Sequence, residues 1–159
     1  MTAQTMQIRN RPCRIYGEPH AEYLLLQMTG EHEVQSMDDE VAAIAQSAHQ
    51  FLFAAIPVEN WNDALSPWKS PAVWGKQGFG GNAADTLRFL TEQIIPSLKQ
   101  QYPLPENVKI ILGGYSLAGL FALWASTQAN LFCGIAAASP SVWFPGWMEF
   151  EQQRLDRKS

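Results

Sequence analysis

The stretch GGYSLAG, residues 113–119, carries the strongest local signal in the sequence. It directly follows the apolar run 108–112 (VKIIL), which predicts a buried strand, and it leads into a mostly apolar segment that predicts a helix over 116–128. A serine on a sharp strand-to-helix turn, flanked by small residues, is typical of a nucleophile elbow. Gly114 stands two residues before the serine, and Ala118 stands two after it, where the usual motif has a second glycine.

This turn would place the serine where nucleophilic chemistry is favoured. It lifts the hydroxyl of Ser116 above the sheet at the N-terminus of a helix, whose dipole favours negative charge. The backbone N–H of Leu117 then points to where an oxyanion would form. The pattern therefore predicts a reactive serine at position 116, and an incidental serine in a glycine-rich turn is the alternative.

Outside this turn, apolar runs alternate with helical patterns along the chain. Further strands are predicted at 23–28 (YLLLQM), 51–57 (FLFAAIP) and 132–138 (FCGIAAA), and a helix that opens at Asp85 should be kinked or shortened by Pro96. Apolar strands separated by helices indicate a parallel sheet covered on both sides. The predicted fold class is α/β, a three-layer α/β/α sandwich with a mostly parallel sheet. Ligands of such sheets bind beyond the carboxyl ends of the strands.

Length and composition bound the organisation and the partners. The chain has 159 residues, 47% hydrophobic and 16% charged, which predicts one domain over 1–159 with about 1–20 as an N-terminal lead-in. A net charge of −4 provides no basic face, so neither nucleic acid nor an anionic membrane is expected as a partner. The longest nearly unbroken apolar run, 117–125, is shorter than the roughly 20 residues of a membrane-spanning helix.

The two cysteines, Cys13 and Cys133, have no closely spaced thiol or histidine neighbours, so we expect neither a metal site nor a disulfide framework. The segment 1–16 is polar and basic and has no apolar core, which predicts the absence of a signal peptide. A reduced, cytoplasmic setting is therefore the default expectation.

Two segments resemble a known family. Residues 113–125 (GGYSLAGLFALWA) and 136–144 (AAASPSVWF) are similar to the esterase branch of the α/β-hydrolase superfamily, which includes esterase D-like and enterochelin-esterase-like proteins. The resemblance extends over about 23–147. It implies an α/β-hydrolase fold and a serine hydrolase that acts on a small-molecule carboxylic ester, without metal or organic cofactor.

The resemblance also assigns roles to individual residues. It matches Ser116 to the nucleophile and Leu117 to one oxyanion donor, and it places the second donor after the first strand, at Thr29 or Gly30. In this fold the serine is followed along the chain first by an acid and then by a histidine. We find no histidine after Ser116, so the resemblance implies a domain truncated at its C-terminus, with weak or absent turnover.

All three histidines precede the serine. His20 and His49 come just before predicted strands and should lie at the far edge of the sheet, because a strand of five or six residues spans roughly 17–20 Å. His32 follows a strand and could reach the pocket, either as a polar loop residue or as the base of an unusual Ser116–His32 dyad.

Aromatic residues follow the strands at the expected ligand-binding edge. Trp61 and Trp68 come after the second predicted strand, and Trp143 comes after the fourth, so they could form an aromatic pocket above Ser116. Ordinary loop packing is the alternative for these tryptophans. Asp63 is a further candidate for this pocket, or it hydrogen-bonds within its own loop.

A function of another class is a non-catalytic scaffold that serves binding or assembly. A truncated sheet would leave an open edge strand and exposed apolar surface, and such edges tend to pair with another chain. A homodimer through an exposed sheet edge is the partner that this alternative predicts.

Overall fold

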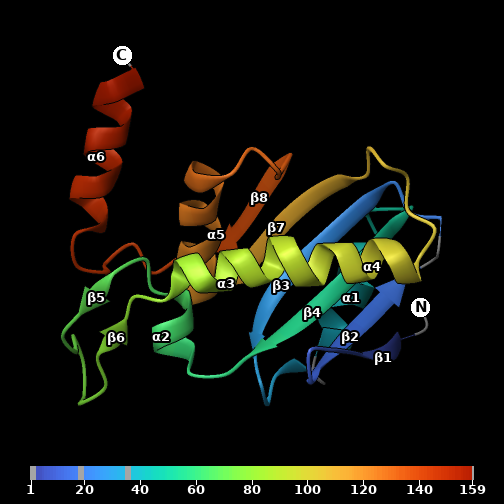
Figure 1. Cartoon of the computed structure of the whole chain (residues 1–159), viewed down its shortest axis with the longest axis horizontal. Coiled ribbons are helices and arrows are strands. Elements are labelled where there is room, and N and C mark those ends of the chain that lie inside the picture. Colours follow the sequence, from blue (N-terminus) through green and yellow to red (C-terminus); the bar gives the residue numbers. More distant parts are fainter. Residues whose placement is uncertain (1–2, 18–19, 35–36, 159) are drawn as a thin grey trace.

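The computed structural model describes residues 3–17, 20–34 and 37–158 (Figure 1). The strands are β1 (Ala3–Ile8), β2 (Arg11–Gly17), β3 (Tyr23–Gly30), β4 (Phe51–Val58), β5 (Lys69–Ser70), β6 (Phe79–Gly80), β7 (Lys109–Tyr115) and β8 (Gly134–Ala138). The helices are α1 (Met37–Ala45), α2 (Trp61–Leu65), α3 (Ala83–Phe89), the π-helical turn η2 (Leu90–Ile94), α4 (Ile95–Gln101), α5 (Leu117–Gln128) and α6 (Trp147–Lys158).

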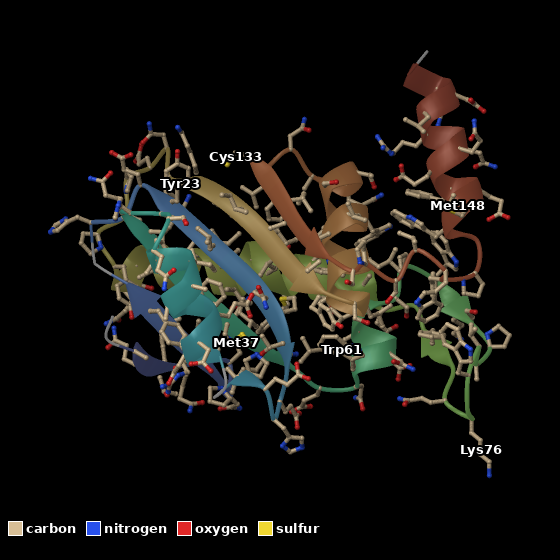
Figure 2. The ribbon with its side chains drawn as sticks, turned by 180° about the vertical axis from the view of Figure 1, so that it is seen from behind. Tyr23, Met37, Trp61, Lys76, Cys133 and Met148 are labelled. Atoms are coloured by element: carbon tan, nitrogen blue, oxygen red, sulfur yellow. The ribbon has the colours of Figure 1, made fainter. Side chains whose placement is uncertain are left out.

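A six-stranded sheet of order β1-β2-β4-β3-β7-β8 forms the middle layer. Strands β4, β3, β7 and β8 run parallel, whereas β2 pairs antiparallel with β4 and β1 pairs antiparallel with β2. Helices α3, α4 and α5 cover one face and α1 covers the other, as Figures 1 and 2 show from opposite sides. The predicted α/β class with a mostly parallel sheet is confirmed.

Strand β4 shows why the layers form. All of its residues are buried, and Leu52 and Ile56 belong to the core beneath α3, α4 and α5. Phe51 and Phe53 belong to a separate core that includes Val41 of α1. Because successive side chains of a strand point to opposite faces, a continuously apolar strand needs cover on both.

The N-terminal residues are part of the sheet. Residues 3–17, which fall within the expected lead-in, form the hairpin β1–β2, and β2 extends the sheet beyond β4. Its apolar residues Cys13 and Ile15 are buried, but the intervening Arg14 is partly exposed and interrupts the run. This alternation hides the strand from a search for continuously apolar segments.

The helix around Pro96 does not end there. It runs from Ala83 to Gln101 and contains the π-helical turn η2, in which the N–H of Ile95 donates to the carbonyl of Leu90. Proline lacks an N–H and its ring clashes with the carbonyl four residues earlier in a regular α-helix. The wider turn lies directly before the proline and accommodates it, so the helix continues.

The carboxyl ends of the parallel strands lie at one edge of the sheet. Figure 2 shows Tyr23 and Cys133 at the amino ends of β3 and β8, and Trp61 beyond the opposite edge. Helix α6 stands apart from the sheet at one end of the molecule (Figure 1). Within the ranges described above, no helix combines the length and apolar character needed to cross a membrane. Both cysteines are free thiols, with Cys13 buried and Cys133 exposed.

Candidate active site

Ser116 adopts a strained backbone conformation between β7 and α5. Its φ is 60° and its ψ is −120°, outside the conformations that non-glycine residues usually adopt. Such strain costs about 1–3 kcal/mol and persists only where the surrounding structure holds it. A Cβ atom at Gly114 would lie 2.4 Å from the carbonyl oxygen of Ala118, so the strand approaches the helix more closely than a side chain permits. This sharp strand-to-helix turn, which we call the elbow, has the backbone geometry that the sequence pattern predicts.

Residues 138–141, which we call the clasp, hold this conformation. The N–H of Ser116 donates to the carbonyl of Ala138 at 3.1 Å, and the carbonyl of Ser116 accepts from the N–H of Ser141 at 3.1 Å. The hydroxyl oxygens of Ser116 and Ser141 lie 3.3 Å apart, and Ser141 is 1% exposed. Ser141 was not predicted as a site residue, although it follows the predicted strand 132–138 by three residues, at the sheet edge where ligands are expected.

A pocket of about 470 Å³ lies between the elbow and the end of β3. Strand β3 pairs with β7 only as far as Gln27, but with β4 as far as Gly30, so the pairing with the elbow strand ends before the last three residues of β3. Thr29 and Ser116 both line this pocket. Leu117 is the first residue of α5, and the N–H groups of a first helical turn have no acceptor within their helix.

Thr29 has an unusual environment. It is 2% exposed, and its hydroxyl oxygen is the one buried side-chain oxygen or nitrogen among the described residues that has no hydrogen-bond partner. Buried polar groups of this kind are normally satisfied, so an unpaired one calls for an explanation. Gly30, the other predicted oxyanion residue, lines a neighbouring pocket instead.

A second pocket, of about 400 Å³, also contains Ser116 and has aromatic walls. Trp61, Trp74, Phe79 and Trp143 line it, together with Leu117 and Ser141. The rings of Trp74 and Trp143 meet edge to face with their centroids 4.4 Å apart. They are 67% and 44% exposed, so the pair forms an accessible rim. The structure thus brings Trp61 and Trp143 to the serine.

Trp68 and Asp63 are not among the residues that line these two pockets. The indole Nε1–H of Trp68 donates to the carbonyl of Pro145 at 2.8 Å, and its ring packs against two phenylalanines. Trp68 therefore fastens its loop to the segment before α6. A Cβ at Gly80 would lie 2.7 Å from Oδ1 of Asp63, and the Asp63 carbonyl accepts from the N–H of Asn82. The contacts of both residues are therefore with other parts of the protein, and they stabilise the loop between β4 and α3.

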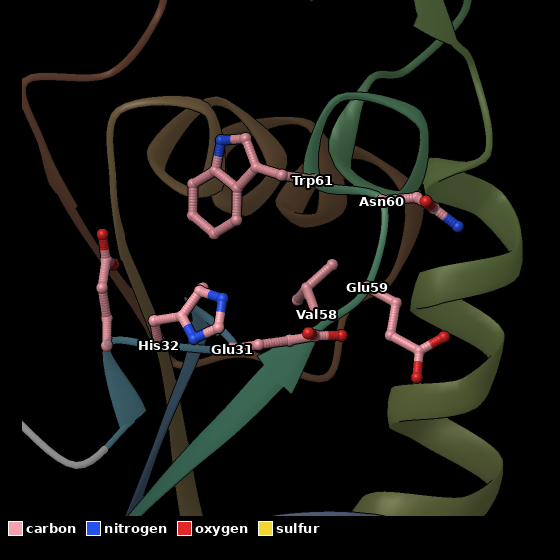
Figure 3. Close-up of a pocket in the computed structure, with 8 residues that line it drawn as sticks. Glu31, His32, Val58, Glu59, Asn60 and Trp61 are labelled. Carbon is pink, nitrogen blue, oxygen red and sulfur yellow. The ribbon is translucent and has the colours of Figure 1, made fainter.

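His32 lines a third pocket, of about 530 Å³, with Gly30, Glu31 and Glu59 (Figure 3). Trp61 lines this pocket as well as both pockets around Ser116, whereas Ser116 is not part of it. The structure therefore does not place His32 in a shared pocket with the serine. Across the described ranges, no group of three or more histidine, cysteine, aspartate or glutamate side chains is arranged to hold a metal ion.

Several solved structures share this fold. An IroE-like serine hydrolase from Shewanella oneidensis is 20% identical with a TM-score of 0.81, and the match covers 96% of this chain and 56% of that protein. A siderophore hydrolase, EstA, from Aspergillus nidulans is 20% identical with a TM-score of 0.68, covering 96% and 61%. The BES protein from Bacillus cereus is 18% identical with a TM-score of 0.66, covering 96% and 66%.

The chain therefore spans 56% to 66% of the length of these structures, and identities of this size show the fold alone. No protein of curated function matches it. A family model described as "Putative esterase" matches residues 29–156, which include the elbow, the clasp and the end of β3. With a match over most of its length, the chain belongs to this esterase family of α/β-hydrolases.

Proposed function

We propose that Ser116 is the nucleophile of a carboxylic-ester hydrolase. The strained elbow carries this proposal, because a non-glycine residue at φ 60° and ψ −120° is tolerated only where the structure holds it in place. Ser116 is partly exposed and opens into two pockets, so an ester carbonyl can reach its hydroxyl. Family membership supports the reaction class.

In the proposed reaction the Ser116 oxygen attacks the ester carbonyl, and the carbonyl oxygen becomes the oxyanion of a tetrahedral intermediate. The N–H of Leu117 donates to that oxygen, and a backbone N–H from the end of β3 is the second donor. Of the two candidates, Thr29 is favoured over Gly30, because Thr29 shares a pocket with Ser116. Neither the attack on the carbonyl nor the stabilisation of the oxyanion requires a metal or an organic cofactor.

The substrate is proposed to be a small-molecule ester with an apolar or aryl group. The pocket lined by Trp61, Trp74, Phe79 and Trp143 supports this, since aromatic walls stack with flat apolar groups.

A serine hydroxyl is a weak nucleophile without a base to take its proton. The 159 residues place all three histidines before Ser116, and His32 lies in a separate pocket. We therefore propose that full turnover needs a histidine and an acid from outside these residues. The chain's coverage of 56% to 61% of two matched structures is consistent with this.

A fluorophosphonate probe tests the proposal, because it reacts covalently with activated serines. We expect slow labelling of the 159-residue protein that is accelerated by imidazole in solution, which supplies the missing base, and that is lost in Ser116→Ala. Equal labelling of the parent and Ser116→Ala would refute the nucleophile assignment. Rapid, Ser116-dependent ester cleavage without imidazole would refute the claim that the base is missing.

A histidine variant pair tests the dyad separately. His32→Ala should leave the labelling rate unchanged, as should His49→Ala, whose side chain is exposed at the opposite edge of the sheet. Labelling that is lost only in His32→Ala would instead show that His32 acts as the base.

The sheet edge favours one alternative, a scaffold that assembles with a second copy. Strand β8 ends the sheet and is partly exposed, and residues 129–148 contain no charged side chain that would oppose pairing. Two copies could pair through β8 in a symmetric homodimer. Sedimentation that shows a stable monomer at all concentrations would refute this assembly.

A further inference from the structure

The hydroxyl of Ser141 is the side-chain group that the structure places against the Ser116 oxygen, at 3.3 Å. Ser141 is 1% exposed, so solvent does not compete for its hydroxyl. Its backbone is fixed as well, because its N–H donates to the Ser116 carbonyl and its carbonyl accepts from the N–H of Phe144. A buried hydroxyl held at both backbone groups and directed at a reacting atom is unlike an incidental surface serine.

We infer that Ser141 is a positioning residue that orients the Ser116 hydroxyl and donates a hydrogen bond to its oxygen as the proton leaves. This inference rests on the proposed role of Ser116 as nucleophile. Once Ser116 has lost its proton, its oxygen can only accept, so the Ser141 hydroxyl must be the donor of the pair. The separation of 3.3 Å is long for two hydroxyls, and we expect it to shorten when the acceptor becomes charged.

Ionisable side chains line both pockets that contain Ser116. Glu33, Glu40 and Tyr115 line the pocket on one side, and Lys76 lines the aromatic pocket on the other. A test of Ser141 must therefore compare variants in which these groups are unchanged.

A thiol introduced at position 116 allows the inference to be tested without a catalytic base, because the pKa of that thiol reports on the hydrogen bond from Ser141. The parent for the experiment is Ser116→Cys combined with Cys133→Ser, which removes the exposed natural thiol. Burial raises the pKa of the remaining natural thiol, Cys13, to about 11, so it stays silent near neutral pH. The rate of iodoacetamide alkylation is measured against pH, with the modified residue identified by peptide mass spectrometry.

Ser141→Ala in this parent should raise the pKa of the introduced thiol by roughly 1, because a hydrogen bond to the thiolate is lost. The alkylation rate at pH 7 should fall only about threefold, since a more basic thiolate is also a better nucleophile. Ser141→Thr keeps the hydroxyl and should restore most of the difference. Ser126→Ala is the matched control, because it removes an exposed hydroxyl that bonds to the Leu123 carbonyl of its own helix.

An unchanged thiol pKa in Ser141→Ala, or an equal shift in Ser126→Ala, would overturn the inference. Circular dichroism checks that each variant folds, and Ser141→Gly replaces Ser141→Ala if the alanine variant loses the parent spectrum. The titration reports on the Ser141 hydroxyl whether or not esters are cleaved. Fluorophosphonate labelling of Ser116 reports on the nucleophile, so failure of one proposal is distinguishable from failure of the other.

Discussion

Replacing Gly114 with alanine should destabilise the protein by disturbing the elbow itself. The added Cβ would lie 2.4 Å from the carbonyl oxygen of Ala118, 2.5 Å from its carbonyl carbon and 2.8 Å from its Cβ. Two of these three atoms belong to the helix backbone, so no side-chain rotation relieves the contact. Either the start of α5 or the end of β7 must move by at least about 0.6 Å to reach even a short contact of 3.0 Å.

The magnitude follows from the packing around this contact. Ala118 and its neighbour Leu117 are 0% and 3% exposed, so the helix start has little free space into which to move. Overpacking in such a core costs about 1–3 kcal/mol and sometimes more. Alanine also lowers the conformational entropy of the unfolded chain relative to glycine, and this offsets about 0.4–1 kcal/mol of the overpacking cost. Because the clash is with backbone atoms, we take the upper end of the overpacking range, about 3 kcal/mol, and therefore expect a net loss of about 2 kcal/mol in the free energy of unfolding.

Urea unfolding followed by tryptophan fluorescence measures this loss, and the matched control is Gly134→Ala in the adjacent strand β8. A Cβ at Gly134 would meet only Cγ1 of Ile111, at an ordinary 3.8 Å, so this variant should be neutral or slightly stabilised. A loss of about 2 kcal/mol lowers the melting temperature of a domain of this size by roughly 4–8 °C.

Two results would refute the reasoning. A Gly114→Ala variant as stable as the parent would show that the backbone contact does not constrain the elbow. The double variant Gly114→Ala, Ala118→Gly should stay destabilised, because it removes the contact with the Ala118 Cβ but keeps the shorter contacts with the backbone of residue 118. Restored stability in this double variant would show instead that the Cβ contact dominates.

Three further predictions concern other parts of the molecule. At pH 8 a thiol reagent should modify Cys133 quickly and Cys13 only on unfolding. Burial raises the pKa of the Cys13 thiol from 9.0 to about 11, so its contribution to the free energy of unfolding is complete below pH 9 and is lost as the pH rises to about 11. Cys13→Ala should reduce this decline, measured as the urea midpoint against pH. Trp68→Phe should cost about 1 kcal/mol in urea unfolding, through loss of its indole hydrogen bond, without changing fluorophosphonate labelling. Replacing Trp74 and Trp143 together by alanine should weaken binding of a non-hydrolysable aryl amide about tenfold in a fluorescence titration, and unchanged affinity would remove these rings from the binding site.

The elbow could be predicted from sequence because its determinants are local. The strand 108–112, the small residues around Ser116 and the apolar helix after it are adjacent in the chain, and together they specify a tight strand-to-helix turn. The layered α/β fold followed from apolar runs that were buried on both faces. The hairpin β1–β2 escaped prediction because its partly exposed strands alternate between polar and apolar residues, so no continuous run marks them.

The surroundings of the serine were decided by tertiary structure. Trp68 and Trp143 gave equal signals in the sequence, yet Trp143 lines a pocket with Ser116 and Trp68 bonds to the Pro145 carbonyl instead. Ser141 lies against Ser116 although it is distant along the chain, because β7 and β8 are neighbours and their carboxyl ends meet. Strand order and the path of the loops set these distances, and neither is encoded in the spacing of residues along a single segment. The sequence by itself therefore determined the tight strand-to-helix turn that carries Ser116, while the tertiary structure determined which side chains share its pockets.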